Sequence, residues 1–134
     1  MTLLIDTTRT GTIRVGLKDR RLHTVQKAFD GPVRGQLLNV IDEVLRKHCV
    51  SPRDLRGIIV AIGPGPFSAL RSACAVANAM SYALRIPAVG VRGECLMRSL
   101  AEQGIKKLPI AKVGTIIVPF YGRPAHITKP KRRA

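Results

Sequence analysis

Apolar and polar positions alternate, or recur at helical spacing, over most of the chain. A compact apolar run at Thr2–Ile5 predicts a buried strand, Thr12–Leu17 alternates around three apolar residues, and Leu22–Phe29 shows a weaker strand pattern. Gly11 and the stretch Lys18–Arg21 mark the turns between them. The chain is therefore expected to begin with three antiparallel strands.

The next periodic segment, Gln36–His48, has the spacing of an amphipathic helix. Its apolar stripe is expected to consist of Leu37, Leu38, Ile41, Val44 and Leu45. Its opposite face is polar and suits solvent, with Asn39, Asp42, Glu43 and Arg46. After it, Ser51–Asp54 has a cap residue, a proline and an acid in the order that starts a short helical turn.

The centre of the chain has the pattern of a β-α-β crossover. Gly57–Ile62 is a short apolar run typical of a strand buried on both faces, and the Gly-Pro-Gly-Pro sequence of Gly63–Pro66 stops it. Phe67–Leu84 is free of glycine and proline and predicts a helix, after which Ala88–Val91 starts a second strand. The two strands should be parallel, with a right-handed connection.

A helical wheel divides the predicted helix Phe67–Leu84 into two different faces. The face suited to the chain's own sheet holds Ala69, Ala73, Val76, Ala77, Met80 and Leu84. The other face is small and almost uncharged, and it holds Ser68, Arg71, Ser72, Ala75, Asn78, Ala79 and Tyr82. Small residues let a second helix approach closely, so this face fits either a neighbouring helix of the same chain or a helix of another protein.

The last third of the chain is expected to begin with a helix at Glu94–Gln103, which has Gly104 as its stop. The buried side of this helix should hold Leu96, Met97, Leu100 and Ala101. A basic connector at Lys106–Lys112 and an apolar strand or edge segment at Thr115–Phe120 should follow. The element order is then β-β-β-α-β-α-β-α. This is the ribonuclease-H-like arrangement, an α/β fold with a mixed sheet that also forms a single lobe of the actin, sugar-kinase and Hsp70 ATPases. Residues 1–121 should form this lobe, and residues 122–134 a flexible tail.

Net charge is the most unusual property of the composition. The 134 residues include 23 Lys and Arg against 8 Asp and Glu, a net charge of +15, which indicates a polyanionic partner. That partner can be a nucleic acid or an acidic protein surface. The basic residues of the tail, expected to contact RNA or an acidic partner, are Arg123, Lys129, Lys131, Arg132 and Arg133.

Candidate chemistry is sparse. Cys49, Cys74 and Cys95 are odd in number and far apart, which excludes a disulfide framework and a zinc site as expectations and favours buried thiols in a reducing compartment. No charged-then-apolar leader and no membrane-spanning run is present, so a cytoplasmic protein without membrane contact is expected. We expect no metal and no catalytic residue in this chain.

Four segments together resemble TsaB, also called YeaZ, the dimerisation subunit of the bacterial machinery that adds threonylcarbamoyl to the adenosine beside the tRNA anticodon. They are LLIDTT at Leu3–Thr8, LLNVIDEVL at Leu37–Leu45, the run from Ser51 to Leu84, and IPAVGV at Ile86–Val91. The family's Gly-Pro-Gly-Ser-Phe-Thr-Gly-Leu-Arg run is matched here at Gly63, Pro64, Gly65, Phe67, Leu70 and Arg71. More weakly, Val118–Pro124 is similar to the family's Pro-x-Tyr-x-Arg tail.

This chain also departs from the family pattern. Pro66 and Ser68 replace a Ser and a Thr, and Ala69 and Ala73 replace two glycines four residues apart. Only 43 residues follow Val91, so the second lobe of a usual TsaB is not expected in this sequence. The chain therefore resembles a one-lobed TsaB-like protein.

The resemblance implies a function. TsaB is a catalytically silent relative of the transferase TsaD, and the two pair through helices that correspond here to Gln36–His48 and Phe67–Leu84. The expected role is a non-catalytic subunit that binds a TsaD-type transferase as a heterodimer and supports threonylcarbamoylation of tRNA. A TsaE-like ATPase is a further possible partner, and a homodimer is an alternative assembly. The rival hypothesis is a stand-alone basic RNA-binding protein without a transferase.

Two sequence features near strand ends are considered as candidates for a nucleotide-binding or anion-binding site. Asp6, Thr7 and Thr8 stand where an ATPase of this superfamily holds metal-bound water and phosphate, but no second strand-end acid accompanies them. We interpret them as a degenerate remnant with a turn or packing role and expect no cofactor; an ATPase completed by self-association is the alternative. Gly63, Pro64 and Gly65 are interpreted as a structural turn, because prolines remove donors that would bind an anion.

Overall fold

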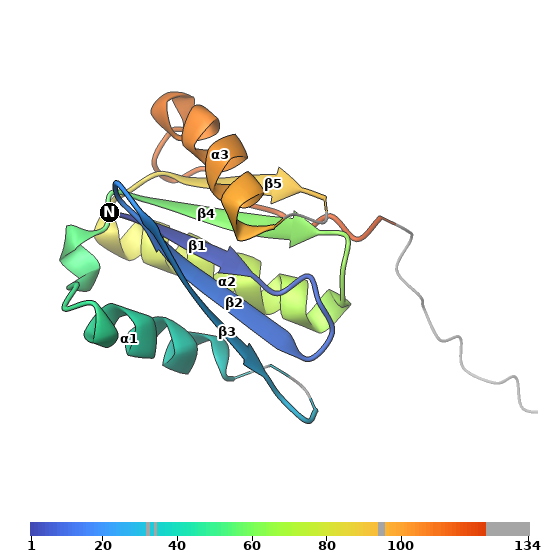
Figure 1. Ribbon diagram of the computed structural model, residues 1–134. Helices are drawn as coiled ribbons and strands as arrows, with labels where there is room; N and C mark the ends of the chain where they lie inside the picture. Colours follow the sequence, from blue (N-terminus) through green and yellow to red (C-terminus); the bar gives the residue numbers. More distant parts are fainter. Residues whose placement is uncertain (32, 34, 94–95, 123–134) are drawn as a thin grey trace, which may run out of the picture.

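A computed structural model of the chain describes residues 1–31, 33, 35–93 and 96–122. Its centre is one five-stranded sheet with the order β3-β2-β1-β4-β5 (Figure 1). The first three strands pair antiparallel, whereas β1 with β4 and β4 with β5 pair parallel. The strands are β1 (Thr2–Asp6), β2 (Thr12–Lys18), β3 (Leu22–Ala28), β4 (Gly57–Gly63) and β5 (Ala88–Arg92).

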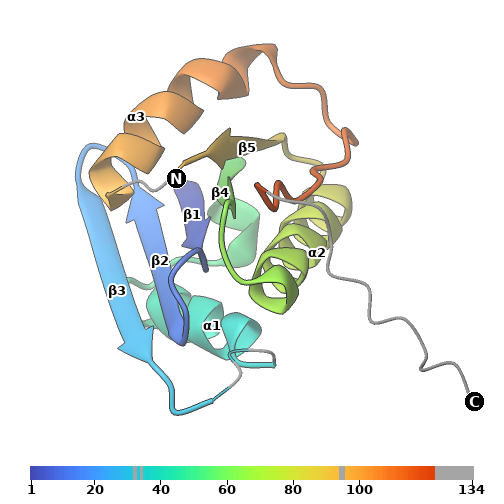
Figure 2. The same cartoon turned by 90° about the vertical axis from the view of Figure 1, so that its right-hand side faces the viewer.

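Three helices cover the two faces of the sheet. In Figure 2, α1 (Leu37–Lys47) and α2 (Phe67–Leu84) lie on the lower side of the sheet and α3 (Met97–Lys107) lies on its upper side. Two single 3-10 turns, Pro52–Asp54 and Leu108–Ile110, follow α1 and α3. The predicted fold class, a mixed-sheet α/β lobe of the ribonuclease-H type, is confirmed.

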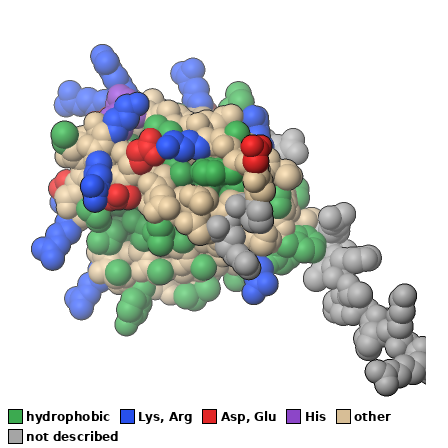
Figure 3. All heavy atoms as spheres, turned by 90° about the horizontal axis from the view of Figure 1, so that it is seen from below, with side chains coloured by type: hydrophobic (Ala, Val, Ile, Leu, Met, Phe, Trp, Pro, Cys, Tyr) green, Lys and Arg blue, Asp and Glu red, His purple; other side chains and the backbone are tan. Residues whose placement is uncertain are grey.

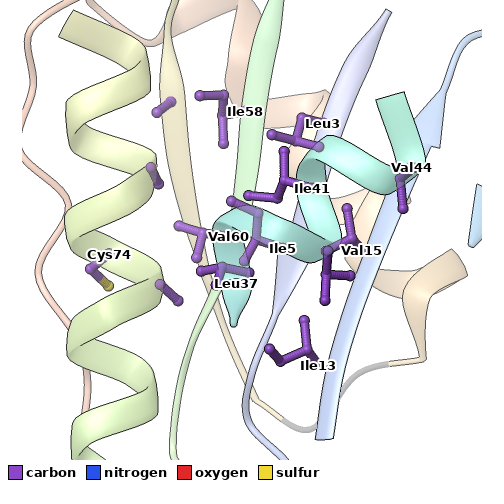
Figure 4. Packing of buried hydrophobic residues seen from close by; sticks show 14 of the residues in the cluster. Leu3, Ile5, Ile13, Val15, Leu37, Ile41, Val44, Ile58, Val60 and Cys74 are labelled. Atoms are coloured by element: carbon purple, nitrogen blue, oxygen red, sulfur yellow. The ribbon is translucent and has the colours of Figure 1, made fainter. Parts of the chain in front are cut away.

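The core has a large layer and a small layer because strand residues alternate between the two faces. Leu3 and Ile5 of β1 point toward α1 and α2, and Leu4 between them points toward α3. Figure 4 shows the large layer, where Ile58, Val60 and their neighbours fill the space between the sheet and the two helices. Burial of aliphatic side chains on both faces therefore fixes the register of the central strands.

The sheet-facing side of α2 is made of small residues. Ala69, Ala73 and Ala77 are buried against the sheet, so the helix backbone comes close to β4. Cys74, which Figure 4 shows on the same helix, is also buried, and loss of hydration raises the pKa of its thiol to about 11. The Cys74 thiol is therefore protonated and unreactive at neutral pH. Cys49 was expected to be buried and is exposed. Cys95 lies outside the described residues.

Three expectations for the helices were wrong. Leu38 is 58% exposed, and Val40, at 2%, takes its place in the buried stripe of α1. Leu96 precedes α3 and is exposed, although it was expected on the buried side. The helix continues through Gly104 to Lys107, so Gly104 does not stop it, and the first two residues of the expected basic connector belong to α3.

The segment Thr115–Phe120 does not form a strand. The segment is irregular and is joined to the rest of the chain by individual hydrogen bonds. In one of them, the Phe120 N–H donates to the Ile62 carbonyl at 2.8 Å. The alternative expectation, an edge segment, is correct: Figure 2 shows the chain returning from α3 past the β5 edge toward α2.

Gly104 serves close packing of α3. A Cβ atom placed there would lie 2.4 Å from Cγ2 of Ile59 in β4, a separation at which one of the two groups must move. The glycine therefore sets the distance between α3 and the sheet.

We predict that Gly104→Ala destabilises the protein by about 1–3 kcal/mol, because overpacking outweighs the gain in helix propensity of about 1 kcal/mol. Urea unfolding of the variant, of Ile59→Ala and of the double variant measures this. The loss caused by Gly104→Ala should shrink in the Ile59→Ala background. An equal loss in both backgrounds would contradict the packing explanation.

Candidate partner interface

The turn before α2 is held from two sides. Gly63 has a φ of +116°, and a Cβ there would lie 2.2 Å from the Phe120 carbonyl oxygen. A Cβ on Gly65 would lie 2.8 Å from the Thr8 carbonyl oxygen. The Gly-Pro-Gly-Pro turn is thus enclosed between the β1–β2 loop and the C-terminal segment, so it can set the direction in which α2 leaves the sheet.

The outer face of α2 is open and small. Ser68, Arg71, Ala75, Ala79 and Tyr82 are exposed, with Tyr82 at 82%. Ser72 is half-buried, and a shallow cavity of about 340 Å³ lies along Ser68, Arg71, Ser72 and Ala75. Between Arg71 and Tyr82, the exposed positions of α2 are occupied by Ala75 and Ala79, so a partner could come close to the helix backbone there.

Asn78 was expected on the open face, but it is engaged by the chain itself. Its Nδ2 donates to the Ile117 carbonyl at 2.9 Å, and its Oδ1 accepts from the Ile117 N–H at 2.8 Å. This two-point contact binds the C-terminal segment along one flank of α2. The segment covers Asn78 and leaves the ridge of Ala75 and Ala79 uncovered.

Helix α1 lies beside α2 and gives the lower face its charged half. Asp42 and Arg46 form an exposed ion pair at 2.9 Å, and Glu43 pairs with Lys27 of β3. Figure 3 shows this face from below: charged side chains gather in one half, and the other half is mainly hydrophobic and uncharged. Leu38, exposed at the start of α1, adds an apolar group to the lower face.

The residues of the expected nucleotide-site remnant make hydrogen bonds and an ion pair within the chain. Asp6 is 3% exposed and forms an ion pair with Arg14, its directly opposite neighbour in β2. Its Oδ1 accepts from the N–H and the hydroxyl of Thr8 at 2.8 and 2.6 Å. The hydroxyl of Thr7 donates to the Ala69 carbonyl in α2 at 3.0 Å. These three residues tie β1 to β2 and α2.

Sequence reasoning did not identify Arg14 as the partner of Asp6. The signal was available only through register, because an antiparallel β1–β2 hairpin with Thr2 opposite Lys18 places Arg14 opposite Asp6. A cavity of about 510 Å³ is lined by Thr8 and Thr10 of the β1–β2 loop, by Pro64, Gly65 and Pro66 of the turn, and by Tyr121 and Gly122. Tyr121 packs edge-on against Phe67 at 4.5 Å between ring centroids.

Some expectations fall on residues about which the structure gives little or nothing. Arg123, Lys129, Lys131, Arg132 and Arg133 of the basic tail all lie outside the described residues. Within the described ranges, no group of three His, Cys, Asp or Glu side chains could hold a metal ion. Over the same ranges, no helix is both long and apolar enough to cross a membrane.

A model of the protein family described as "TsaD: tRNA N6-adenosine threonylcarbamoyltransferase" matches residues 34–111. The chain belongs to this family. Within the TsaD family it is TsaB-like, which confirms the resemblance in its sequence. It is 36% identical over 101 residues to the tRNA threonylcarbamoyladenosine biosynthesis protein TsaB of Buchnera aphidicola subsp. Baizongia pistaciae, a match covering 75% of this chain and 45% of that protein.

The chain is also similar to a transferase and to a protein of known structure. A tRNA N6-adenosine threonylcarbamoyltransferase of Geobacter metallireducens is 48% identical over 52 residues, which are 39% of this chain and 15% of that enzyme. YeaZ from Pseudomonas aeruginosa has the same fold, with a TM-score of 0.66 and 24% identity over 77% of this chain and 49% of that one. The chain thus spans about half the length of the TsaB and YeaZ proteins it matches.

We predict that Asn78→Ala frees the C-terminal segment from α2. Loss of both hydrogen bonds should lower the free energy of unfolding by about 1–3 kcal/mol, because the Ile117 N–H and C=O lose their partners. Hydrogen exchange at the Ile117 amide should accelerate, whereas Ser72→Ala on the same helix should leave it unchanged. Asn78→Asp keeps the acceptor but not the donor and should retain part of the protection. Unchanged exchange in Asn78→Ala would contradict the assigned contact.

Proposed function

We propose that this TsaB-like chain is a non-catalytic subunit that binds a TsaD-type transferase and supports threonylcarbamoylation of the adenosine beside the tRNA anticodon. The observation that carries the proposal is the uncovered ridge of Ala75 and Ala79 on α2. Family membership supports the reaction in which the subunit takes part, since both TsaB and the transferase occur among its relatives by name.

The ridge favours a helix as the partner element. Small residues allow two helix backbones to approach within about 8 Å, at the short end of helix packing distances. Arg71 and Tyr82 stand at either end of the ridge and are exposed, so they can contact a partner, and both residue types are enriched in protein interfaces. The charged outer face of α1 beside the ridge supplies polar contacts that fix orientation.

The hydrogen-bonded and ion-paired state of the Asp6 carboxylate supports a non-catalytic role. Mg²⁺ held through a carboxylate needs an oxygen with a free lone pair directed at the ion or its water. Oδ1 of Asp6 accepts two hydrogen bonds from Thr8 and Oδ2 accepts one from Arg14, so Mg²⁺ or its water would have to compete with these partners. Releasing Asp6 would leave the buried Arg14 guanidinium without this counter-charge, which is costly.

The net charge of +15 favours one second candidate, a basic RNA-binding protein that acts without a transferase. The two candidates differ in the use of the α2 ridge, which RNA binding through charge does not require. They are therefore separated by measuring transferase binding and RNA binding on the same variants.

We predict that Ala75→Leu and Ala79→Leu each weaken binding to a purified TsaD-type transferase from the same organism. Overpacking of a close helix contact costs about 1–3 kcal/mol, which corresponds to a rise in Kd of about 5- to 150-fold by calorimetry. Ala28→Leu, at an exposed position of β3, is the matched control and should leave the Kd unchanged.

Equal affinity of all three variants would refute the ridge as the interface. Absence of any binding by the unmodified chain would favour the stand-alone RNA-binding protein. A dimer of this chain that the two ridge variants abolish, with no transferase binding, would replace the heterodimer by a homodimer.

A further inference from the structure

A second surface of the chain concentrates positive charge in a groove, on the opposite side of the sheet from the α2 ridge. The groove lies between the β2–β3 turn and α3 and has a volume of about 570 Å³. Half of its eight lining residues are basic, against 23 of 134 residues in the chain. The lining residues are Lys18, Arg20, Arg21, Leu22, Arg98, Ala101, Glu102 and Ile105.

Among the residues that the structure describes, the basic residues of the turn form no ion pair with an acid. Over the described ranges, the ion pairs within 4.0 Å do not include Lys18, Arg20 or Arg21. Lys18 instead donates to backbone carbonyls of its own turn, at 2.9 Å to Asp19 and 3.3 Å to Arg20. Arg20 and Arg21 are exposed, so their guanidinium groups are accessible to an anionic ligand.

Two acids accompany the groove, and they reduce its four positive charges to a net charge of +2 (four basic residues less two acids). Asp19 accepts from the Arg21 N–H at 2.8 Å, and this bond lowers the pKa of its carboxyl, so Asp19 is ionised and directed into its own turn. Glu102 stands 3.7 Å from Arg98 across one turn of α3, with both side chains largely exposed. Such an exposed pair is weak and can open for a stronger anion.

The chemistry of the groove matches a phosphate backbone. Three of its four cations are arginines, whose planar guanidinium groups can bind phosphate oxygens through two parallel hydrogen bonds. Leu22, Ala101 and Ile105 form apolar walls beneath them, and low-dielectric walls under charges of one sign focus the potential toward the opening. A polyanion with charges at regular spacing is the ligand that several convergent cations favour.

We propose that this groove binds the sugar–phosphate backbone of tRNA. The identity of the RNA as tRNA rests on the proposed function, whereas the site itself is inferred from the charge and geometry of the groove alone. Because α3 and the β2–β3 turn lie on the other side of the sheet from α1 and α2, one molecule can hold RNA here and a protein partner on the α2 ridge at the same time (Figure 1).

The test compares two variants of the full chain that each lose three positive charges. The groove variant is Arg20→Ala/Arg21→Ala/Arg98→Ala, and the control is Arg9→Ala/Arg46→Ala/Lys112→Ala, at exposed positions away from the groove. Affinity for an unmodified tRNA transcript is measured by fluorescence anisotropy over a range of salt concentrations. Unfolding midpoints verify that both variants are folded.

The groove variant should lose at least 10-fold in affinity at about 0.1 M salt, and its log–log salt slope should fall by roughly 2–3, near 0.9 for each lost phosphate contact. The control should lose less than about threefold. The charge-conserving variant Arg20→Lys/Arg21→Lys/Arg98→Lys should keep most of the slope.

Equal losses in the groove and control variants would overturn the proposal and leave transferase binding on the α2 ridge untouched. Unchanged tRNA binding with weakened transferase binding in the groove variant would overturn it as well, and would assign the groove to an acidic protein surface. Groove-dependent tRNA binding without any transferase binding would support the groove and refute the proposed function.

Discussion

The close contact between α2 and β4 determines how the rest of the chain is arranged. Ala69, Ala73 and Ala77 face the sheet, and their small size brings the helix backbone onto β4. The Gly-Pro-Gly-Pro turn fixes where this helix begins, because Gly63 and Gly65 have no room for a side chain. Since the opposite face of α2 is also small, a helix that lies close to its own sheet remains accessible to a second helix at equally short range.

The two sides of the sheet then take different roles. On the α1–α2 side, the C-terminal segment uses Asn78 to lie along one flank of α2 and leaves the alanine ridge uncovered. On the α3 side, Gly104 brings the helix close to Ile59, and the β2–β3 turn beside it presents cations toward solvent. The two proposals therefore assign the protein partner and the RNA to opposite sides of the sheet, where they would not compete for one surface.

Periodicity alone was sufficient for the strands and helices, because burial on one or both faces leaves a period in the sequence. It was insufficient where one residue type has two uses. Gly104 has the pattern of a helix stop but serves close packing, and Thr115–Phe120 has the apolar content of a strand, although a side chain of α2 satisfies its backbone at Ile117. The Asp6–Arg14 pair depends on strand register, and the burial of Val40 in place of Leu38 depends on how α1 rolls against β2, neither of which local pattern contains.

Alanine-methyl NMR tests the central claim most directly, because alanines lie on both faces of α2 and on α3. On addition of the TsaD-type transferase, the methyl resonances of Ala75 and Ala79 should shift strongly, while those of Ala73 and Ala77 against the sheet and Ala101 on α3 should stay near their original positions. Strong shifts at Ala101 with unchanged Ala75 and Ala79 would contradict the account, because the partner would then bind the other side of the sheet.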